Sequence, residues 1–188
     1  AESEQAAAQL YQIWEKRELE GKPLSERDEI NLSYQLAIRL LEKADEIVNE
    51  QLKRISNPDR QAEYLFISPS VSPRKEVRDS VFEALLVADN RRIEPWASTA
   101  VSLLNHRLRE AESVEYIRPA LEILEEVQRT GDIFFPTAWL RALLGGHSSV
   151  QARDEVEAFY AEYPDFPEML LNKIRQQADH LYRLHAGE

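Results

Sequence analysis

The chain has 188 residues, 43% of them hydrophobic and 30% charged, a composition typical of a folded globular protein and not of a disordered one. Its 34 acidic residues outnumber 23 basic ones, and a net charge of −11 repels phosphate backbones, so nucleic acid is not an expected partner. The sequence contains no cysteine, which excludes disulfides, a thiolate nucleophile and cysteine-ligated zinc.

No apolar run approaches the roughly 18 residues of a membrane span, and the N-terminus lacks a basic and then apolar signal. We therefore expect no membrane partner, and a soluble protein of either the cytoplasm or the periplasm. The only methionine is Met169. This suggests that Ala1 is a processed or engineered start, and that the chain is a fragment of a longer protein.

Apolar residues recur at helical spacing along the whole chain, and the glycines fall where helical patterns end. The first helix is predicted from about Ser3 to Glu20, where Gly21, Lys22 and Pro23 stop it. Ser25 then caps a long helix that continues to about Ile55. No segment alternates with period two, so no strand and no sheet are predicted.

The remaining helices are short and are separated by proline, glycine and serine. They are predicted at 57–66, 72–86, 94–108, 113–129, around Trp139, at 149–163, and from 168 towards the C-terminus. Pro119 lies inside one of them, so we expect a kink or an irregular first turn there. The segment Gly145–Ser148 is predicted to be the most flexible turn.

These elements predict an all-α chain of about eight or nine helices with no sheet. No sequence unit repeats at a fixed period, so a regular tetratricopeptide or ankyrin array is not supported. The expected architecture is an irregular α-solenoid, a HEAT- or ARM-like stack of antiparallel helix pairs with a concave face. Because no long linker interrupts the pattern, we treat 1–188 as a single helical domain.

The segment Asn90–Trp96 places two arginines, Arg91 and Arg92, directly before the helix start at Glu94 and Pro95. Cationic side chains beside the free N–H groups of a helix N-terminus favour an anion such as a carboxylate or phosphate. We therefore regard Asn90, Arg91, Arg92, Glu94 and Trp96 as candidates for contacting substrate or lining a cavity. The alternative is that Arg91 or Arg92 pairs with Asp89 or Glu94 and that Trp96 is a core residue.

Catalytic and metal sites are not predicted within the chain. The four histidines are His106, His147, His180 and His185, and no two of them have the four-residue spacing of a helical zinc site. His147 and Ser148 are adjacent but lack a nucleophile elbow, and no catalytic residue or cofactor is expected. A run of carboxylates is predicted to lie on a solvated helix face; it comprises Glu122, Glu125 and Glu126.

Large aromatic residues cluster after Asp132, at Phe134, Phe135 and Trp139. With Trp14, they are candidates for an interface with a neighbouring domain, which would need an exposed apolar patch. The alternative is that they simply fill a core.

Several short sequence motifs follow one another along the chain in a fixed order. They are Leu10–Trp14, Ile55–Arg60, Asn90–Trp96, Tyr116–Pro119 and Gln128–Pro136. Together they resemble the C-terminal helical domain of bacterial M1-family (gluzincin) zinc aminopeptidases, and the resemblance spans nearly the whole chain.

In that family a β-domain and a thermolysin-like catalytic domain precede the helical domain, and the catalytic domain carries HExxH and a GxMEN-type loop. Neither motif occurs in this chain. The resemblance thus implies a non-catalytic C-terminal part of a larger peptidase, which encloses the catalytic cavity, limits or contacts the peptide substrate, and packs on the catalytic domain of the same polypeptide. Zinc would belong to the parent enzyme, and Arg91 could meet a peptide carboxylate or brace a domain junction.

Two other functions remain open. The chain could be a stand-alone helical-repeat scaffold that binds protein partners, which an upstream sequence without HExxH would support. It could also be a small hydrolase that uses His147, although the geometry of a base and a nucleophile is missing.

Overall fold

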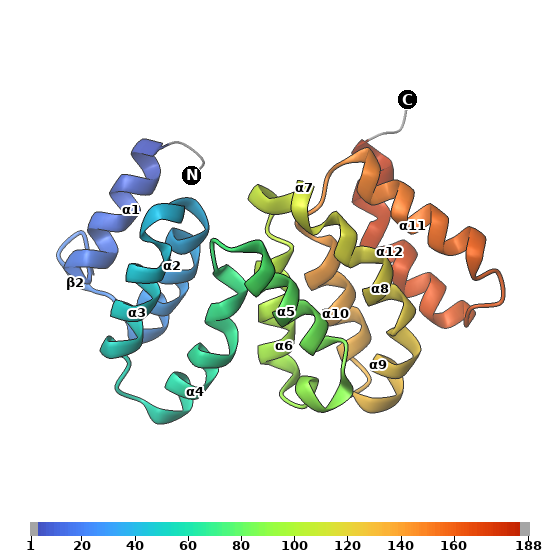
Figure 1. Ribbon diagram of the computed structural model, residues 1–188, viewed down its shortest axis with the longest axis horizontal. Coiled ribbons are helices and arrows are strands. Elements are labelled where there is room, and N and C mark those ends of the chain that lie inside the picture. The colour runs from blue at the N-terminus through green and yellow to red at the C-terminus, as the bar shows by residue number, and fades with distance from the viewer. Residues whose placement is uncertain (1–3, 185–188) are drawn as a thin grey trace. The chain divides into compact units, whose positions relative to one another are not determined.

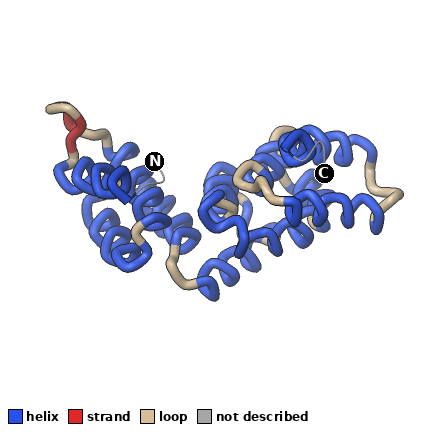
Figure 2. Tube along the Cα trace, turned by 90° about the horizontal axis from the view of Figure 1, so that it is seen from above, coloured by secondary structure: helices blue, strands red, loops and turns tan. Residues whose placement is uncertain are grey.

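The computed structural model describes residues 4–184, which are almost entirely helical (Figures 1 and 2). The all-α prediction is confirmed, but the helices are shorter and more numerous than expected within these residues. The predicted first residue of the first helix, Ser3, and one of the four histidines, His185, lie outside the described part. The α-helices are α1 (Glu4–Lys16), α2 (Glu26–Arg39), α3 (Ala44–Arg54), α4 (Pro58–Ile67), α5 (Lys75–Leu85), α6 (Glu94–Leu104), α7 (Glu110–Ser113), α8 (Ile117–Glu122), α9 (Leu124–Thr130), α10 (Phe135–Leu144), α11 (Val150–Glu162) and α12 (Glu168–Leu184).

Short 3-10 turns link several of these helices. They are η1 (Leu41–Lys43), η2 (Ser68–Val71), η3 (Ala88–Arg91), η4 (Arg107–Arg109) and η5 (Val114–Tyr116). The contacts within the chain form two compact units, Ala1–Arg78 (unit 1) and Asp79–Glu188 (unit 2), and each unit is described by itself. None of the helices in residues 4–184 combines the length and apolar character that crossing a bilayer requires.

The long helix predicted from Ser25 to Ile55 is wrong, because the chain folds back in its middle. Leu40 leaves helical geometry with φ −110° and ψ 68°, and η1 turns the chain into α3, which packs against α2. No glycine or proline marks this break. Read as one helix, this segment has an unusually wide apolar stripe. The stripe belongs to two helices that face each other, since Leu36 of α2 and Ile47 of α3 are buried in one cluster with Trp14.

The first helix is also shorter than predicted, and a small sheet replaces its last turn. The chain leaves α1 at Arg17, which has φ +60°. Glu18–Leu19 (β1) then pairs antiparallel with Lys22–Pro23 (β2), shown as the strand pair beyond the helix in Figure 2. Glu20 and Gly21 both have positive φ at the turn between the strands, as tight two-residue hairpins require. The prediction of no sheet is therefore wrong for this one hairpin.

In unit 2, α10 is the central helix, in contact with α6, α8, α9 and α12. Its residues Trp139, Leu140, Leu143 and Leu144 are fully buried. The helix predicted over 113–129 is broken into η5, α8 and α9 (Figure 1). The irregular turn expected near Pro119 is confirmed, because a 3-10 turn precedes α8 and Pro119 is the third residue of that helix. Ser149 caps α11 by accepting a hydrogen bond from the backbone N–H of Ala152, and the helix begins close to the predicted position.

One arrangement occurs three times in the fold. A glutamate at the first position of a helix accepts a hydrogen bond from a backbone N–H that lies just before a distant helix. Glu26 of α2 binds Ser56 ahead of α4 at 2.8 Å, Glu94 of α6 binds Asp132 ahead of α10 at 2.8 Å, and Glu110 of α7 binds Ser148 and Ser149 ahead of α11 at 2.5 Å each. A carboxylate at this position also lies at the positive end of a helix dipole. The three glutamates therefore bring together the starts of three pairs of helices.

Candidate functional site

The residues predicted as a candidate site lie in unit 2, where η3 and the start of α6 meet the loop before α10. Glu94 Oε1 accepts the backbone N–H of Asp132, which ties the two segments together. Asp132 in turn holds the turn that leads into α10, since its Oδ1 accepts the N–H groups of Phe134 at 2.6 Å and Phe135 at 2.9 Å. This loop, Gly131–Phe134, is therefore held at both ends; we call it the α10 loop.

Gly131 is required here by space and not by backbone conformation, since its φ is −102°. A Cβ at this position would lie 2.4 Å from Cδ1 of Phe135 and 2.9 Å from Oε1 of Glu94. Any other residue would push the Phe135 ring or the Glu94 carboxylate out of place. The glycine therefore allows the close approach of the two segments.

Arg91 is only 2% exposed and its two terminal nitrogens are paired inside unit 2, while its buried Nε has no hydrogen-bond partner among the described residues. Its Nη1 donates to the carbonyl of Leu85 at 2.7 Å, its Nη2 donates to Oε1 of Glu126 at 2.5 Å, and its guanidinium lies 5.6 Å from the ring centre of Trp139. Glu126 is thus the partner of a buried cation, although its side chain is 37% exposed and Glu122 and Glu125 on the same helical stretch are exposed, as predicted. Sequence reasoning missed this pair because its members are 35 residues apart.

The other members of the segment lie nearer the surface. Arg92 is exposed and pairs with Asp89 at 2.8 Å, which confirms the pairing alternative for this arginine. Asn90 donates from Nδ2 to the carbonyl of Ala84 at 2.9 Å, and Trp96 is half-buried in the first turn of α6. A hollow of about 180 Å³ is lined on one side by Asp89, Arg91, Arg92 and Glu94, and on the other by Thr130, Gly131 and Phe135; Asn90 and Trp96 are not part of its lining. Both arginines beside it already bind carboxylates, so an incoming anion would have to displace Asp89 or Glu126.

The predicted aromatic cluster divides into core and surface. Phe135 and Trp139 are buried in unit 2, and Trp139 donates from Nε1 to the carbonyl of Ala120 at 3.2 Å. Trp14 is buried in unit 1, where its Nε1 donates to Oε1 of Gln51 at 2.7 Å. These three side chains fill the interiors of their own units and are not available to another domain. Phe134 differs: it is 74% exposed, and its neighbour Ile133 is 76% exposed.

A second polar centre, which sequence reasoning took for a flexible turn, surrounds His147. The turn is packed: a Cβ on Gly146 would lie 1.8 Å from the carbonyl oxygen of Asn105, and His147 is 2% exposed. His147 Nε2 lies 2.9 Å from Oδ1 of Asn105, and His180 Nε2 donates to the carbonyl of His147 at 3.1 Å. The expectation of flexibility at Gly145–Ser148 is therefore wrong, because side chains from α7 and α12 hold this turn.

The His147 centre does not have the geometry of a Ser–His hydrolase. The hydroxyl of Ser148 donates to Oε2 of Glu110 at 3.0 Å, and His147 Nδ1 has no hydrogen-bond partner among the described residues. Burial lowers the pKa of His147 to about 4, against the opposing effect of the Glu110 charge, so the ring is neutral at pH 7. Because the Ser148 hydroxyl binds Glu110 and the His147 ring faces Asn105, the two side chains do not form a nucleophile–base pair.

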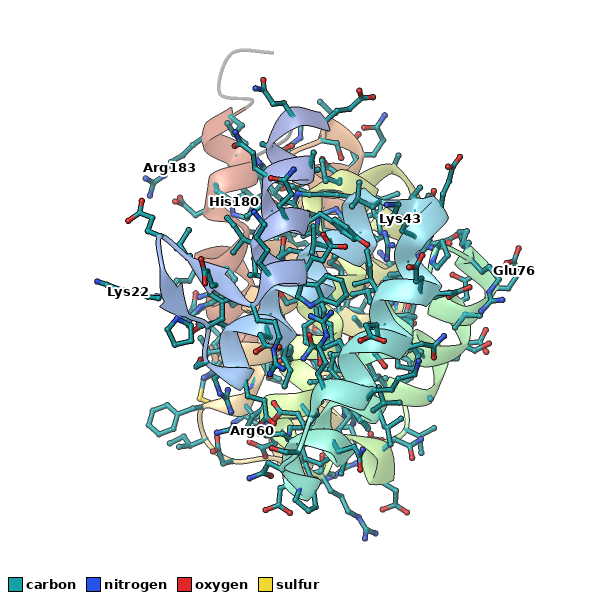
Figure 3. All side chains as sticks on the ribbon, turned by 90° about the vertical axis from the view of Figure 1, so that its left-hand side faces the viewer. Lys22, Lys43, Arg60, Glu76, His180 and Arg183 are labelled. Atoms are coloured by element: carbon teal, nitrogen blue, oxygen red, sulfur yellow. The ribbon has the colours of Figure 1, made fainter. Side chains whose placement is uncertain are left out.

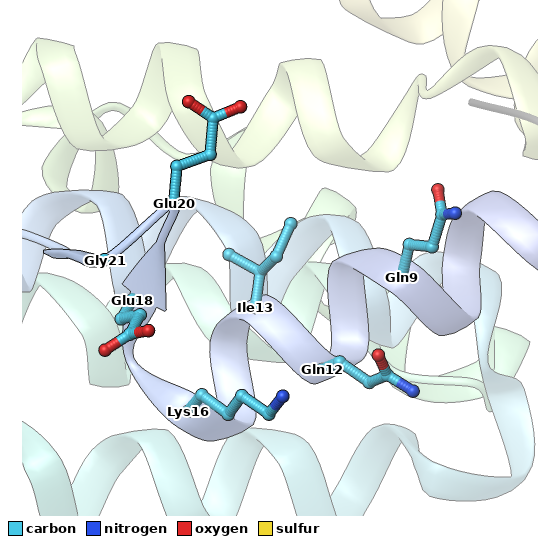
Figure 4. Close-up of a pocket in the computed structure, with 7 residues that line it drawn as sticks. All are labelled: Gln9, Gln12, Ile13, Lys16, Glu18, Glu20 and Gly21. Carbon is cyan, nitrogen blue, oxygen red and sulfur yellow. The ribbon is translucent and has the colours of Figure 1, made fainter.

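Unit 1 has an open hollow of about 350 Å³ beside α1 (Figure 4). Gln9, Gln12, Ile13 and Lys16 of α1 line one side, and Glu18 and Glu20 of the β hairpin line the other. All of these side chains except half-buried Ile13 are exposed. The hollow therefore lacks the buried polar groups that orient a ligand in most binding sites.

Within residues 4–184, no group of three or more histidine, aspartate or glutamate side chains is arranged to hold a metal ion. Comparisons with known protein families, with characterised proteins and with solved structures find no match for this chain.

Proposed function

We propose that this chain is a non-catalytic helical module of an M1-family zinc aminopeptidase, which encloses the catalytic cavity of the parent enzyme and limits or contacts its peptide substrate. The parent enzyme removes N-terminal residues from peptides, and its zinc and catalytic groups lie in another part of the polypeptide. The proposal begins from the short sequence motifs that, in their order along the chain, resemble the C-terminal domain of that family.

The observation that carries the proposal is a contact between two of these motifs. Asn90–Trp96 and Gln128–Pro136 are far apart in sequence, and they join through the hydrogen bond from Asp132 to Glu94. Gly131, which belongs to the motif Gln128–Pro136, makes room for this contact. The two motifs are therefore parts of one corner, and each depends on the other for its position. This relation is expected of sequence features that belong to a common fold.

The same corner presents a surface suited to packing on another domain. The α10 loop exposes Ile133 and Phe134 side by side in sequence, while Asp132 and Glu94 fix its backbone. Exposed large apolar side chains on a fixed loop are typical of an interaction surface, because leaving them in water is unfavourable. We assign Phe134 to the contact with the catalytic domain. Arg91, which is buried and paired, serves to brace this corner.

The proposed architecture is an irregular solenoid of helix pairs. The three glutamates that join helix starts support it, since each links two helices that begin at the same end, as alternate helices of a stack do. In unit 1, for example, α3 packs on α2, and α4 begins beside the start of α2. Within each unit, helix pairs of this kind could supply one side of a cavity.

The test uses the complete polypeptide that contains this chain. Its upstream sequence should carry HExxH with a downstream glutamate, and the purified protein should release N-terminal residues from peptides. A chelator should abolish this activity and zinc should restore it. A complete polypeptide without the motif and without chelator-sensitive release would refute the proposal and would favour the stand-alone protein-binding scaffold.

A further inference from the structure

His147 lies where four segments of unit 2 meet, and this position makes it a junction. Asn105 follows α6, Glu110 begins α7, Ser148 and Ser149 lead into α11, and His180 belongs to α12 (His180 is labelled in Figure 3). Each of these segments contributes a polar group to the corner. The backbone at Gly146 packs directly against the carbonyl of Asn105, with no space for a side chain between them.

The hydrogen-bond network assigns the tautomer of His147. Asn105 donates from Nδ2 to the carbonyl of Val101 at 2.9 Å, so its Oδ1 is the atom that faces Nε2 of His147. Nε2 must therefore carry the hydrogen, and the lone pair of the neutral ring is on Nδ1. A proton taken up by His147 would bind at Nδ1, which is buried and has no hydrogen-bond partner among the described residues.

Glu110 is the carboxylate nearest to that proton, but its oxygens are already used. Oε1 lies 3.9 Å from Nδ1 of His147 and accepts the N–H groups of Ser148 and Ser149 at 2.5 Å each. Oε2 accepts the Ser148 hydroxyl. A protonated His147 is then either a poorly paired buried cation or a partner that draws Glu110 away from these N–H groups. Both outcomes weaken the hold on the start of α11.

The other charged groups nearby do not compensate for this cation. His180 donates to the carbonyl of His147, and a charge on its ring would repel an imidazolium. On α12, Asp179 pairs with Arg183, and on α11, Asp154 pairs with Arg153 at 3.1 Å. In the described part of the chain, Glu110 and His180 are thus the titratable groups that act on the His147 ring.

We infer that His147 is an acid-operated latch: its protonation releases the Ser148–Ser149 turn and the start of α11 from Glu110, while the helices around α10 stay folded. The latch is closed when the ring is neutral. This inference rests on the corner itself and is independent of the proposed peptidase role.

Amide hydrogen exchange of the 188-residue chain, corrected for the pH dependence of intrinsic exchange, tests the latch. Burial lowers the pKa of His147 to about 4, and the ring regains a value near 6.5 when the corner opens. Linkage then predicts that the open population at Ser149 and Ala152 rises about 20-fold between pH 7 and pH 5. Amides in the middle of α10 should not follow this rise. An equal rise in α10 would mean global unfolding and would overturn the latch.

Two matched variants identify the group that senses pH. His147→Gln keeps an N–H donor for Asn105 but cannot titrate, and it should remove the 20-fold change. His180→Gln keeps a donor for the carbonyl of His147 and should retain it. A His147→Gln variant with the full pH response would refute the inference. If that variant does not fold, NMR titration of the unmodified chain decides: the Ser148 and Ser149 amide shifts must share their midpoint with His147, and a midpoint that follows Glu110 instead overturns the proposal.

Discussion

The corners at Glu26 in unit 1 and at Glu110 in unit 2 are held by the same kind of hydrogen bond, from serine N–H and hydroxyl groups to a glutamate. They differ in the basic side chain that lies beside the glutamate. Glu26 binds Ser56 and also Arg60, which lies 2.5 Å away (Arg60 is labelled in Figure 3). The Ser56 N–H and Arg60 together lower the pKa of Glu26 to about 2. Glu110 binds Ser148 and Ser149 beside His147, a group that is neutral at pH 7. The Glu26 corner is thus held by a permanent cation, whereas the Glu110 corner lies beside a histidine that is neutral at pH 7 and becomes charged only in acid.

The largest effect is expected from Gly146→Ala, which tests how tightly the Glu110 corner is packed. The new Cβ would lie 1.8 Å from a backbone oxygen, and a backbone atom cannot turn aside as a side chain can. We expect the free energy of unfolding to fall by about 3 kcal/mol in urea titrations. Gly21→Ala is the control, since it meets no atom within 4 Å and carries only the strain of its φ of +76°, about 1 kcal/mol. Equal losses for the two variants would show that the corner is loose.

The second effect is the dependence of stability on pH. The pKa of His147 is lower in the folded state than in the unfolded state, so the unfolded chain takes up the proton first as the pH falls below about 6.5. The contribution of His147 to the free energy of unfolding is therefore fully present above pH 6.5. It falls by about 2 kcal/mol by pH 5, and the decline ends near pH 4. Comparing urea unfolding of the unmodified chain and His147→Gln at pH 7.5 and pH 5 isolates this contribution.

The Glu26 corner should behave differently in the same titration. Its pKa is also lowered, to about 2, so its contribution is present above pH 4.5 and is lost only as the pH falls from there towards 2. Between pH 7.5 and pH 5 it should contribute no pH dependence. A Glu26→Gln variant that changed the slope in this range would contradict the comparison.

The third effect compares neutral substitutions in the two corners. Glu110→Gln and Glu26→Gln each keep an oxygen acceptor but lose the charge that strengthens the hydrogen bonds, so each should cost about 1–2 kcal/mol in urea unfolding at pH 7.5. They should differ in one readout: Glu110→Gln also lowers the pKa of His147 further, because the Glu110 charge supports its protonated form. NMR titration of His147 should show this downward shift in Glu110→Gln and no shift in Glu26→Gln.

The parts of the fold that sequence could predict are those fixed by local chemistry. Asn57 caps α4 with its side chain, Ser149 caps α11, and Gly131 ends α9, all near the predicted positions. The fold-back at Leu40 was missed because it has no local breaker; packing of α2 on α3 through Leu36 and Ile47 produces it. The wide apolar stripe was the available signal.

The candidate site shows the same division. The position of the arginines before a helix start was readable, since proline at the start of a helix has a local cause. Their partners were only partly readable: Arg92 binds Asp89 three residues away, but Arg91 binds Glu126, which is 35 residues away. His147 was interpreted as flexible because two glycines precede it, while its contacts come from Asn105, Glu110 and His180. Long-range polar pairing was thus the main information that the sequence alone did not provide.

The third of these glutamate corners, at Glu94, should give the smallest effect in the isolated chain. Its loop presents Phe134 to solvent, so Phe134→Ala removes little buried area and should change the free energy of unfolding of the 188-residue chain by no more than about 0.5 kcal/mol. In the complete polypeptide, the same change should cost about 3 kcal/mol if Phe134 packs on the catalytic domain, because truncating a buried phenylalanine leaves a cavity. Leu65→Ala, at an exposed site of unit 1, is the control in both proteins. Equal behaviour of Phe134→Ala in the isolated chain and in the complete polypeptide would remove Phe134 from the proposed interface.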